Sequence, residues 1–287
     1  MSPLNNPDAV RRQYINDVHL RRQREIMTQY AVNKINFPEW VLRCFYWRGG
    51  ETVLDLGAGG GWYYPAFEQV VPNTTYYALD FSVGVLATHP ASESLVLGDA
   101  LQIPFADNSF DVIMANHMMY YLPDLDAGIQ EIRRVLKPNG SLLAATNSSH
   151  NMPEFQALFR RAILLLTSPG TARVKAPPSP SDSFSLESGL RRLSRHFLGI
   201  VRYDMPNQLV FTEAEPALEY INSTRGLREA QLPPGVNWDE AMLIISQQMN
   251  ALIEHLGELV VSTLAGVLIA SDAGGIFEEF FKYRRAL

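Results

Sequence analysis

A carboxylate followed at once by a run of glycines is the first feature of this 287-residue sequence that could do chemistry. Asp55 stands two residues before Gly57, and Ala58, Gly59 and two more glycines follow. Glycine lets the backbone adopt positive φ and approach a ligand closely. A short apolar run ends at Leu56, so we expect the turn at the carboxyl end of a strand, where open α/β sheets bind ligands.

The spacing of the glycines limits which ligand this turn binds. The dinucleotide fingerprint G-x-G-x-x-G needs glycine where Trp62 or Tyr64 stands, which excludes a dehydrogenase site. The phosphate loop G-x-x-x-x-G-K-[ST] needs a lysine that does not follow here. The pattern instead suits a nucleoside that carries an amino acid and no phosphate.

Two further carboxylates follow the next apolar runs of the chain. Asp80 comes after the second run, where an acid can accept hydrogen bonds from both ribose hydroxyls, and Phe81 beside it could lie against a purine face. Asp99 ends the third run and could accept from an exocyclic amino group. A single such acid is commonly a helix cap or a turn residue, but three at successive strand ends indicate one nucleoside site.

The elements that must position these side chains are short apolar runs, typical of strands buried on both faces of a parallel sheet. The runs are Thr52–Leu56, Thr75–Leu79, Leu95–Leu97, Val112–Ala115 and Leu142–Thr146. Helices are expected between them, and the clearest begins after Asp124, a good N-cap, and ends at the Lys-Pro-Asn-Gly sequence 137–140. Strands that alternate with helices predict an α/β fold with right-handed βαβ units.

The rest of the chain predicts additions around this core. We expect helices over residues 8–30, from Pro38 to Gly49–Gly50, and over 153–166, 213–222 and 239–258; strands over 197–203, 209–211 and 264–270; and a lid-like Pro- and Ser-rich loop over 167–188. The expected division is an N-terminal helical cap (1–48), a Rossmann-like cofactor-binding core (49–150), a lid insertion with its loop (151–190), and the end of the core sheet (191–287) with a helical insertion at about 213–258.

Four segments, in order, resemble the class I S-adenosylmethionine-dependent methyltransferases, particularly the ubiquinone/menaquinone-methyltransferase-like group (methyltransferase type 11). They are VLDLGAGGG, YYALDFS, LGDALQIPFADNSFDVIMAN and EIRRVLKPNGSLLAATN, covering roughly residues 50–148. The resemblance implies a Rossmann-like, seven-stranded, mostly parallel sheet with helices on both faces and an antiparallel last strand. It also implies S-adenosyl-L-methionine (SAM) as the cofactor and S-adenosyl-L-homocysteine (SAH) as its product.

The resemblance further implies which residues hold the cofactor. The implied contacts are Asp55, Gly57 and Gly59, with Ala58 between them, to the methionine moiety; Asp80 to the ribose; Asp99 with Ala100 to the adenine; and Asn116 to the methionine and substrate side. Aromatic walls would suit a sulfonium. The aromatic residues expected near the strand tips are Trp62, Tyr63, Tyr64, Tyr120 and Tyr121, and Tyr30 and Trp40 are expected to reach the pocket from the N-terminal region.

The general base is an open question. Methyl transfer is an in-line displacement, and a hydroxyl acceptor usually needs a base whereas an amine or thiolate does not. Many relatives read N-x-x-L-H-H-L-P-D after the fourth strand, but this chain has Tyr120 and Tyr121 at the two histidine positions. Tyrosine, with a pKa of about 10, is a poor base. The catalytic candidates are His117 and Tyr121, with His150 as a weaker one, so the relatives' acceptor does not carry over.

Composition narrows the remaining classes of partner, metal site and cellular location. A net charge of −6 and the lack of a basic, aromatic-interleaved stretch disfavour a nucleic-acid partner. The single Cys44 excludes an internal disulfide and a cysteine-based zinc site, and no metal is expected. No apolar run reaches the roughly 18–20 residues of a membrane span, and no secretory signal is visible, so we expect a cytoplasmic protein.

The expected acceptor is a small molecule. Two alternatives stay open: a methyltransferase that acts on a macromolecule (RNA or protein), and a non-catalytic SAM- or SAH-binding module of the same fold. An open basic face and salt-dependent RNA binding would point to the first. The sequence leaves the oligomeric state undetermined.

Overall fold

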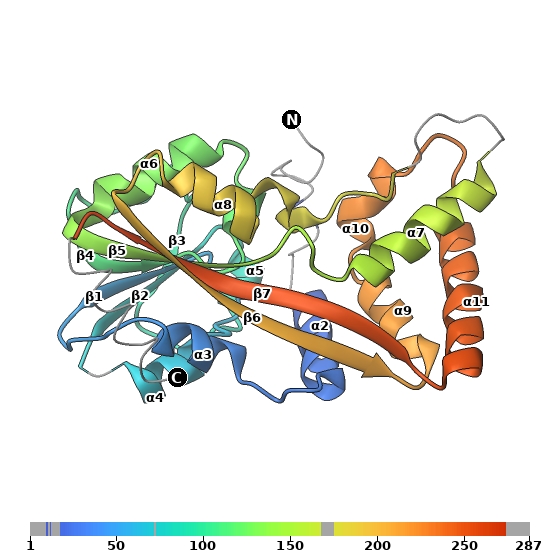
Figure 1. Cartoon of the computed structure of the whole chain (residues 1–287). Coiled ribbons are helices and arrows are strands. Elements are labelled where there is room, and N and C mark those ends of the chain that lie inside the picture. The colour runs from blue at the N-terminus through green and yellow to red at the C-terminus, as the bar shows by residue number, and fades with distance from the viewer. Residues whose placement is uncertain (1–9, 11, 13–17, 72, 168–174, 274–287) are drawn as a thin grey trace.

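The computed structural model describes residues 10, 12, 18–71, 73–167 and 175–273 (Figure 1). Within them seven strands form one sheet in the order β3-β2-β1-β4-β5-β7-β6. They are β1 (Thr52–Leu56), β2 (Thr75–Asp80), β3 (Leu95–Leu97), β4 (Phe110–Met114), β5 (Leu136–Asn147), β6 (Gly199–Phe211) and β7 (Leu259–Ser271). Strands β1 to β5 pair in parallel, and β7 is antiparallel to β5 and β6. The expected Rossmann-like sheet with an antiparallel last strand is confirmed.

Helices cover both faces of the sheet because successive strand residues point to opposite sides. Helices α3 and α4 pack on the face that contains Val53 and Val112, and α6 and α8 pack on the face that contains Leu54 and Ile113. The helices are α2 (Val18–Tyr30), α3 (Phe37–Arg43), α4 (Tyr64–Val70), α5 (Val83–Leu86), α6 (Leu125–Val135), α7 (Pro153–Leu166), α8 (Leu186–Leu193), α9 (Ala214–Asn222), α10 (Arg225–Arg228) and α11 (Trp238–Leu256), with short turns η2 (Met119–Tyr121), η3 (Pro180–Ser183) and η4 (Glu229–Gln231). Burial on both faces explains why the strands read as unbroken apolar runs.

Strands β6 and β7 continue past the core and carry a second, helical lobe, seen on the right of Figure 1. Helices α7, α9 and α11 pack together there on the outer ends of the two strands, and α2 lies against α9 and β6. The lobe has its own buried cluster, which includes Leu209 and Phe211 of β6 and Val261 of β7. Phe159 of α7 meets Trp238 of α11 with ring centroids 5.5 Å apart. The helices expected over 153–166 and 239–258 therefore share one lobe.

Several elements differ from the sequence-based expectation. Strands β5 and β7 begin earlier than expected, at Leu136 and Leu259. The strands expected over 197–203 and 209–211 form one strand, β6, which begins at Gly199. It is continuous because β6 is the edge strand of the sheet and an edge tolerates Pro206. The helix after Pro38 ends at Arg43 and not at Gly49–Gly50. The expected loop 167–188 contains η3 and the start of α8. Residues 168–174 of that loop, and most of the expected helix before residue 18, lie outside the described residues.

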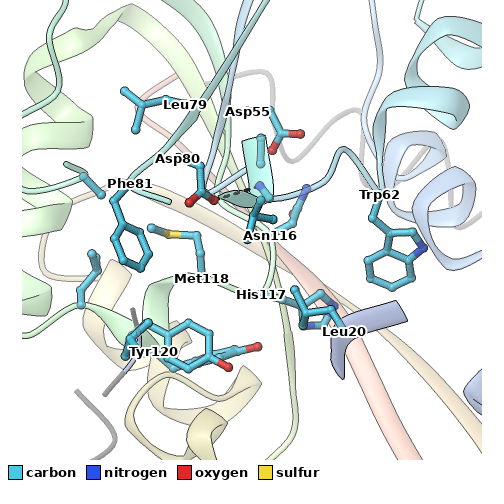
Figure 2. A pocket seen from close by; sticks show the side chains of 18 of the residues that line it. Leu20, Asp55, Trp62, Leu79, Asp80, Phe81, Asn116, His117, Met118 and Tyr120 are labelled. Atoms are coloured by element: carbon cyan, nitrogen blue, oxygen red, sulfur yellow. Dashed lines mark hydrogen bonds between the residues drawn. The ribbon is translucent and has the colours of Figure 1, made fainter. Parts of the chain in front are cut away.

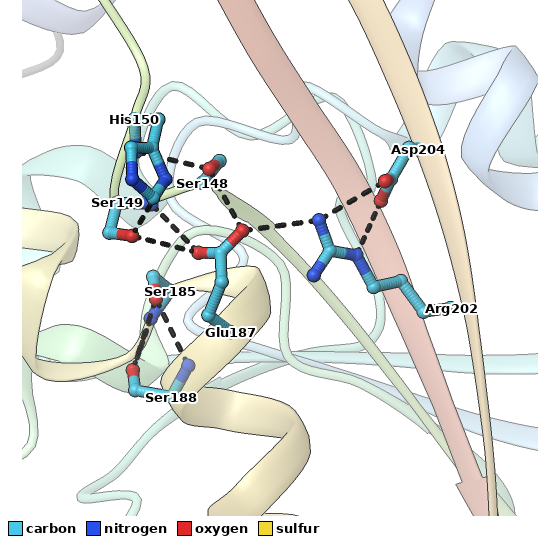
Figure 3. Close-up of polar contacts among 8 residues, drawn as sticks. All are labelled: Ser148, Ser149, His150, Ser185, Glu187, Ser188, Arg202 and Asp204. Carbon is cyan, nitrogen blue, oxygen red and sulfur yellow. Dashed lines mark hydrogen bonds and ion pairs between the residues drawn. The ribbon is translucent and has the colours of Figure 1, made fainter.

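A cluster of polar side chains joins the core to the lobe at the end of β5 (Figure 3). Glu187 of α8 accepts hydrogen bonds from the Ser148 hydroxyl (2.9 Å) and from the backbone N–H (2.9 Å) and hydroxyl (3.1 Å) of Ser149. Arg202 of β6 pairs with Glu187 at 3.1 Å and also with Asp204. Burial opposes ionisation of Glu187, but hydrogen bonds from the Ser149 N–H and the Ser148 hydroxyl lower its pKa to about 2. The charged carboxylate therefore ties β5, α8 and β6 together.

Candidate active site

A cavity lies at the carboxyl ends of β1, β2 and β4, where the loops after neighbouring parallel strands converge (Figure 2). It is lined by all the cofactor-binding candidates and by the two main catalytic candidates: Asp55, Gly57, Ala58, Gly59, Asp80, Phe81, Asp99, Ala100, Asn116, His117 and Tyr121. The aromatic residues Trp62, Tyr63 and Tyr120 line it as well. Residues that are far apart in the chain thus surround one space.

Close packing makes glycine necessary at the start of the turn. Gly57 has a φ of +70°, and its N–H and that of Ala58 donate to the Leu79 carbonyl at 2.7 and 3.1 Å. A Cβ at position 57 would lie 2.7 Å from the Met118 Cβ. A side chain there would strain the backbone and displace the Met118 wall of the cavity.

Asp80 ties the glycine turn to the tip of β2. Its Oδ2 accepts a hydrogen bond from the Gly59 N–H at 2.9 Å (Figure 2). Its Oδ1 accepts from the Ser82 N–H, also at 2.9 Å. Burial raises the pKa of this carboxyl, while the backbone hydrogen bonds lower it. Each carboxylate oxygen has two lone pairs, so Asp80 keeps acceptor capacity for a ligand.

Asp55 is oriented by a buried chain of polar groups behind the cavity. The Tyr76 hydroxyl donates to Asp55 Oδ2 at 2.9 Å and lies 3.2 Å from His89 Nε2. The Ala91 N–H donates to His89 Nδ1 at 3.0 Å, so a neutral His89 carries its proton on Nε2 and donates to Tyr76. Burial raises the pKa of Asp55, the Tyr76 hydrogen bond lowers it and the neighbouring Asp80 raises it, to about 7. A cationic ligand group would favour the charged form.

Two buried polar atoms on the cavity lining have no hydrogen-bond partner among the described residues. They are the Tyr63 hydroxyl and the Asn116 side-chain nitrogen. The Ala145 N–H donates to Asn116 Oδ1 at 3.0 Å, which fixes the orientation of this amide. Leaving a buried polar atom unpaired costs about 1–3 kcal/mol. Both atoms are therefore suited to bond a molecule that enters the cavity.

His117 lies among aromatic rings at the tip of β4. Its ring centroid is 5.5 Å from that of Phe37 and 5.9 Å from that of Trp62, and its φ is +56°. Burial, and to a smaller extent the nearby Arg24, lower the pKa of His117 to about 4. The imidazole is therefore neutral at pH 7. The Tyr121 ring lies edge-on to Tyr120, with centroids 4.5 Å apart.

Four residues considered from the sequence lie away from this cavity. Tyr64 packs against Tyr76 and His89 behind Asp55. Tyr30 meets Phe211 in the lobe, at 4.8 Å between ring centroids. Trp40 stacks on Phe37 and so supports the cavity wall from behind. His150 lies in the polar cluster at the end of β5, where its Nδ1 is 3.3 Å from the Ser149 hydroxyl (Figure 3).

The main residues that sequence reasoning missed come from α2. Leu20 and Arg24 line the cavity, and the Arg24 guanidinium carbon lies 4.6 Å from the Trp62 ring centroid. The excess of basic residues over residues 1–50 was the only signal, and such an excess is more often a solvated helix face.

Neither a metal centre nor a membrane-crossing helix occurs in the described ranges. No three His, Cys, Asp or Glu side chains are grouped there to hold a metal ion. None of the helices described is long and apolar enough to cross a bilayer.

Comparison with known proteins identifies the central part of the chain. Residues 54–144 match a family described as a methyltransferase domain. A demethylmenaquinone methyltransferase of Corynebacterium glutamicum is 35% identical over 130 residues, which are 45% of this chain and 56% of the relative. A malonyl-[acyl-carrier protein] O-methyltransferase of Coxiella burnetii is 36% identical over 107 residues, 37% of each chain. The chain thus spans about half the length of the first of these relatives, and less of the second.

A solved structure matches over most of the chain. A methyltransferase described as putative, from an antibiotic biosynthesis pathway of Anabaena variabilis, aligns with a TM-score of 0.56 over 85% of this chain and 99% of that chain. The sequence identity is 14%, so this likeness is one of fold.

Proposed function

We propose that this chain, which belongs to the class I S-adenosylmethionine-dependent methyltransferases, transfers a methyl group from SAM to an oxygen, nitrogen or carbon nucleophile of a small molecule. The observation that carries the proposal is the cavity at the strand tips. Two buried carboxylates, Asp55 and Asp80, stand there beside the unpaired polar atoms of Tyr63 and Asn116. Because buried polar groups are normally hydrogen-bonded, these atoms fit a polar ligand.

The cavity residues fit the successive parts of SAM. We assign Asp80 to the two ribose hydroxyls, since its oxygens keep free acceptor sites beside the Gly59 and Ser82 N–H groups. The other assignments are Asp55, Gly57, Ala58 and Gly59 to the methionine moiety, Phe81, Asp99 and Ala100 to the adenine, and Asn116 to the methionine and substrate side. SAM bound in this way supplies an electrophilic methyl group on a sulfonium sulfur.

The remaining pocket residues serve the acceptor and exclude water. Aromatic faces of Trp62 and Tyr120 favour a cation in a dry space. For an acceptor that must lose a proton, we propose His117 as the base and Tyr121 as a second polar contact. A base with a pKa of about 4 is weak, so it suits an acceptor whose proton is acidic.

We propose a small-molecule acceptor that binds between the cofactor site and the helices around it. The relatives' names refer to different acceptors, a demethylmenaquinone and a malonyl group on a carrier protein, although both relatives match this chain at similar identity. We therefore assign cofactor binding to residues 49–150 and acceptor selection to the cap (1–48) and to the insertions at 151–190 and about 213–258. Residues 191–287 otherwise complete the sheet.

Calorimetric titration with SAH tests the cofactor assignment. The wild-type protein is expected to bind one equivalent with micromolar or tighter affinity. Asp80→Asn should weaken binding at least about 30-fold, equivalent to about 2 kcal/mol, because ribose hydroxyls lose a charged acceptor. The matched control is Asp107→Asn, an exposed acid that pairs with Arg134 outside the cavity and should leave affinity unchanged.

Each outcome of the titration bears on a separate statement. A folded wild-type protein that does not bind SAH would contradict the proposed function. Equal affinity in Asp80→Asn would contradict the ribose assignment alone. SAH binding without methyl transfer in a broad acceptor screen would favour the non-catalytic alternative, and salt-dependent RNA binding would favour a macromolecular acceptor.

A further inference from the structure

A buried arginine stands in the helical lobe, outside the cavity just described. Arg228 of α10 is 5% exposed. Its Nη2 donates to the Pro177 carbonyl at 2.7 Å and to Gln156 Oε1 at 3.2 Å, and its guanidinium lies 4.4 Å from the centroid of the Phe159 ring. Its Nε has no hydrogen-bond partner among the described residues. The side chain is thus held in place while its buried Nε–H donor is unused.

The guanidinium has no carboxylate partner within ion-pair distance in the described part of the chain. Asp182 of η3 acts on Arg228 only as a nearby charge, and its carboxylate accepts from the Ser179 N–H at 3.0 Å. Three residues away, the exposed Arg225 pairs with both Glu229 and Asp239 at 2.8 Å. Arg225 is therefore paired with two acids, whereas the buried Arg228 is paired with none among the described residues.

Burial makes this arrangement costly. Burial lowers the pKa of Arg228, and Asp182 and Tyr220 only partly oppose it, to a value of about 10, so the group remains a cation at pH 7. A buried charge without a counter-ion is among the least favourable groups in a protein interior. The aromatic face of Phe159 offsets only part of that cost. An anion bound at Nε would supply the missing partner.

We propose that Arg228 binds an anionic group, a carboxylate or a phosphate, carried by the methyl acceptor. A guanidinium recognises the planar or tetrahedral oxygens of such groups with charge-assisted hydrogen bonds. Tyr220 lies near enough to Arg228 to affect its pKa, and its ring lies 5.9 Å from that of Phe155, so this ring pair supplies apolar surface for the rest of the molecule. Tyr220 and Gln156 are only half-buried, so the site lies close to solvent.

A short segment connects this site to the cofactor cavity. η3 carries Asp182, whose charge acts on Arg228, and the next residue, Ser183, donates its hydroxyl to the Tyr120 carbonyl at 2.9 Å. Tyr120 and Tyr121 line the cofactor cavity. An acceptor held at Arg228 by its anionic end can therefore extend past η3 toward the site of methyl transfer. That the anion belongs to the acceptor rests on the proposed function; the anion site itself does not.

The test is an anion titration that needs no knowledge of the acceptor. Inorganic phosphate or acetate replaces chloride at constant ionic strength, and thermal unfolding of the full chain is followed. Wild type and the matched control Arg225→Gln should be stabilised saturably by one of the two anions. In Arg228→Gln the midpoint concentration should rise at least roughly tenfold. A response to phosphate alone indicates a phosphate-bearing acceptor, and a response to acetate a carboxylate-bearing one.

A second measurement covers the case in which Arg228→Gln fails to fold. The side-chain Nε–H signal of Arg228, assigned by its absence in Arg228→Lys, should shift in wild-type protein as the anion is added. An unmoved signal, or an unchanged midpoint in a folded Arg228→Gln, would overturn the proposal and leave Arg228 a packing residue. SAH affinity, measured in parallel, should be the same in Arg228→Gln and wild type, so failure of the cofactor assignment is recognised separately.

Discussion

The carboxyl edge of the sheet and the helical lobe hold their buried charges in different ways. At the sheet edge, Asp55 and Asp80 lie in the last two residues of the neighbouring strands β1 and β2, and backbone N–H groups and the Tyr76 hydroxyl orient them. In the lobe, Arg228 donates hydrogen bonds to Gln156 and Pro177, more than fifty positions earlier in the chain. The first arrangement depends on local turns after strands, and the second on how distant helices pack.

The two regions also differ in the sign of the charge that they offer. The sheet edge presents carboxylates, which suit the cationic ammonium and sulfonium groups of SAM. The lobe presents a guanidinium, which suits an anion. Because the family match covers residues 54–144 and not the lobe, the common cofactor and the individual acceptor are assigned to separate regions. The following predictions test that separation.

The largest effect is expected from a methyl group in the glycine turn. In Gly57→Ala, the new Cβ would lie 2.7 Å from the Met118 Cβ at a φ of +70°. Strain of about 1–2 kcal/mol together with overpacking of about 1–3 kcal/mol should weaken SAH binding roughly 100-fold, as measured by calorimetry.

A glycine in the lobe provides the matched control. Gly257 also has a positive φ, of +87°, but a Cβ there would meet no atom within 4 Å. Gly257→Ala should therefore lower the free energy of unfolding slightly and leave SAH affinity unchanged. If both variants lose affinity equally, general destabilisation and not the close approach at Met118 explains the effect.

A smaller, pH-dependent effect on SAH affinity is expected from Tyr76, which lies behind the cavity. A bound cation favours ionised Asp55, whose pKa is about 7 without ligand, so SAH affinity should rise between about pH 6 and pH 8. Tyr76→Phe removes a hydrogen bond that lowers this pKa. The midpoint should move to higher pH, and affinity at pH 7 should fall about tenfold. Tyr77→Phe, on the opposite face of β2, should keep the wild-type profile. An unshifted midpoint in Tyr76→Phe would show that Asp55 does not control binding.

The smallest effect, on the free energy of unfolding, is expected at Glu187 in the polar cluster at the end of β5, which joins the core to the lobe. The pKa of Glu187, about 2 in the folded protein, is lower than the usual value of about 4.3 in an unfolded chain. Its contribution is therefore fully present above about pH 4.3 and is lost as the pH falls toward 2. Because the side chain is 32% exposed, Glu187→Gln should cost only about 1–2 kcal/mol at pH 7, measured by denaturant unfolding.

Glu187→Gln also tests whether the stability of the fold and cofactor binding depend on separate regions. Glu187→Gln should lose part of the stability difference between pH 2 and pH 5 and retain wild-type SAH affinity. Glu93→Gln, a substitution at an exposed position, should change neither quantity. A loss of SAH affinity in Glu187→Gln would mean that the polar cluster around Glu187 also shapes the cofactor cavity.

Much of the fold was predictable because the core strands are local, strongly patterned segments. The run Thr52–Leu56 and the run Leu95–Leu97 coincide with β1 and β3, and Pro153–Leu166 coincides with α7. Prediction failed where long-range pairing overrides local signals. Two strands were expected over 197–203 and 209–211, yet β6 is one strand that passes through Pro206, because only one side of this edge strand needs backbone partners.

The sequence by itself determined the glycine turn, the order of the carboxylates at the strand tips and hence the resemblance to methyltransferases. These features lie within a few residues of a strand end, where backbone geometry leaves little choice. Only the tertiary structure revealed that α2 brings Arg24 to the cavity, that Tyr76 and His89 stand behind Asp55, and that Arg228 is buried without an acid. Burial and charge pairing depend on residues distant in the chain, so no local pattern could report them.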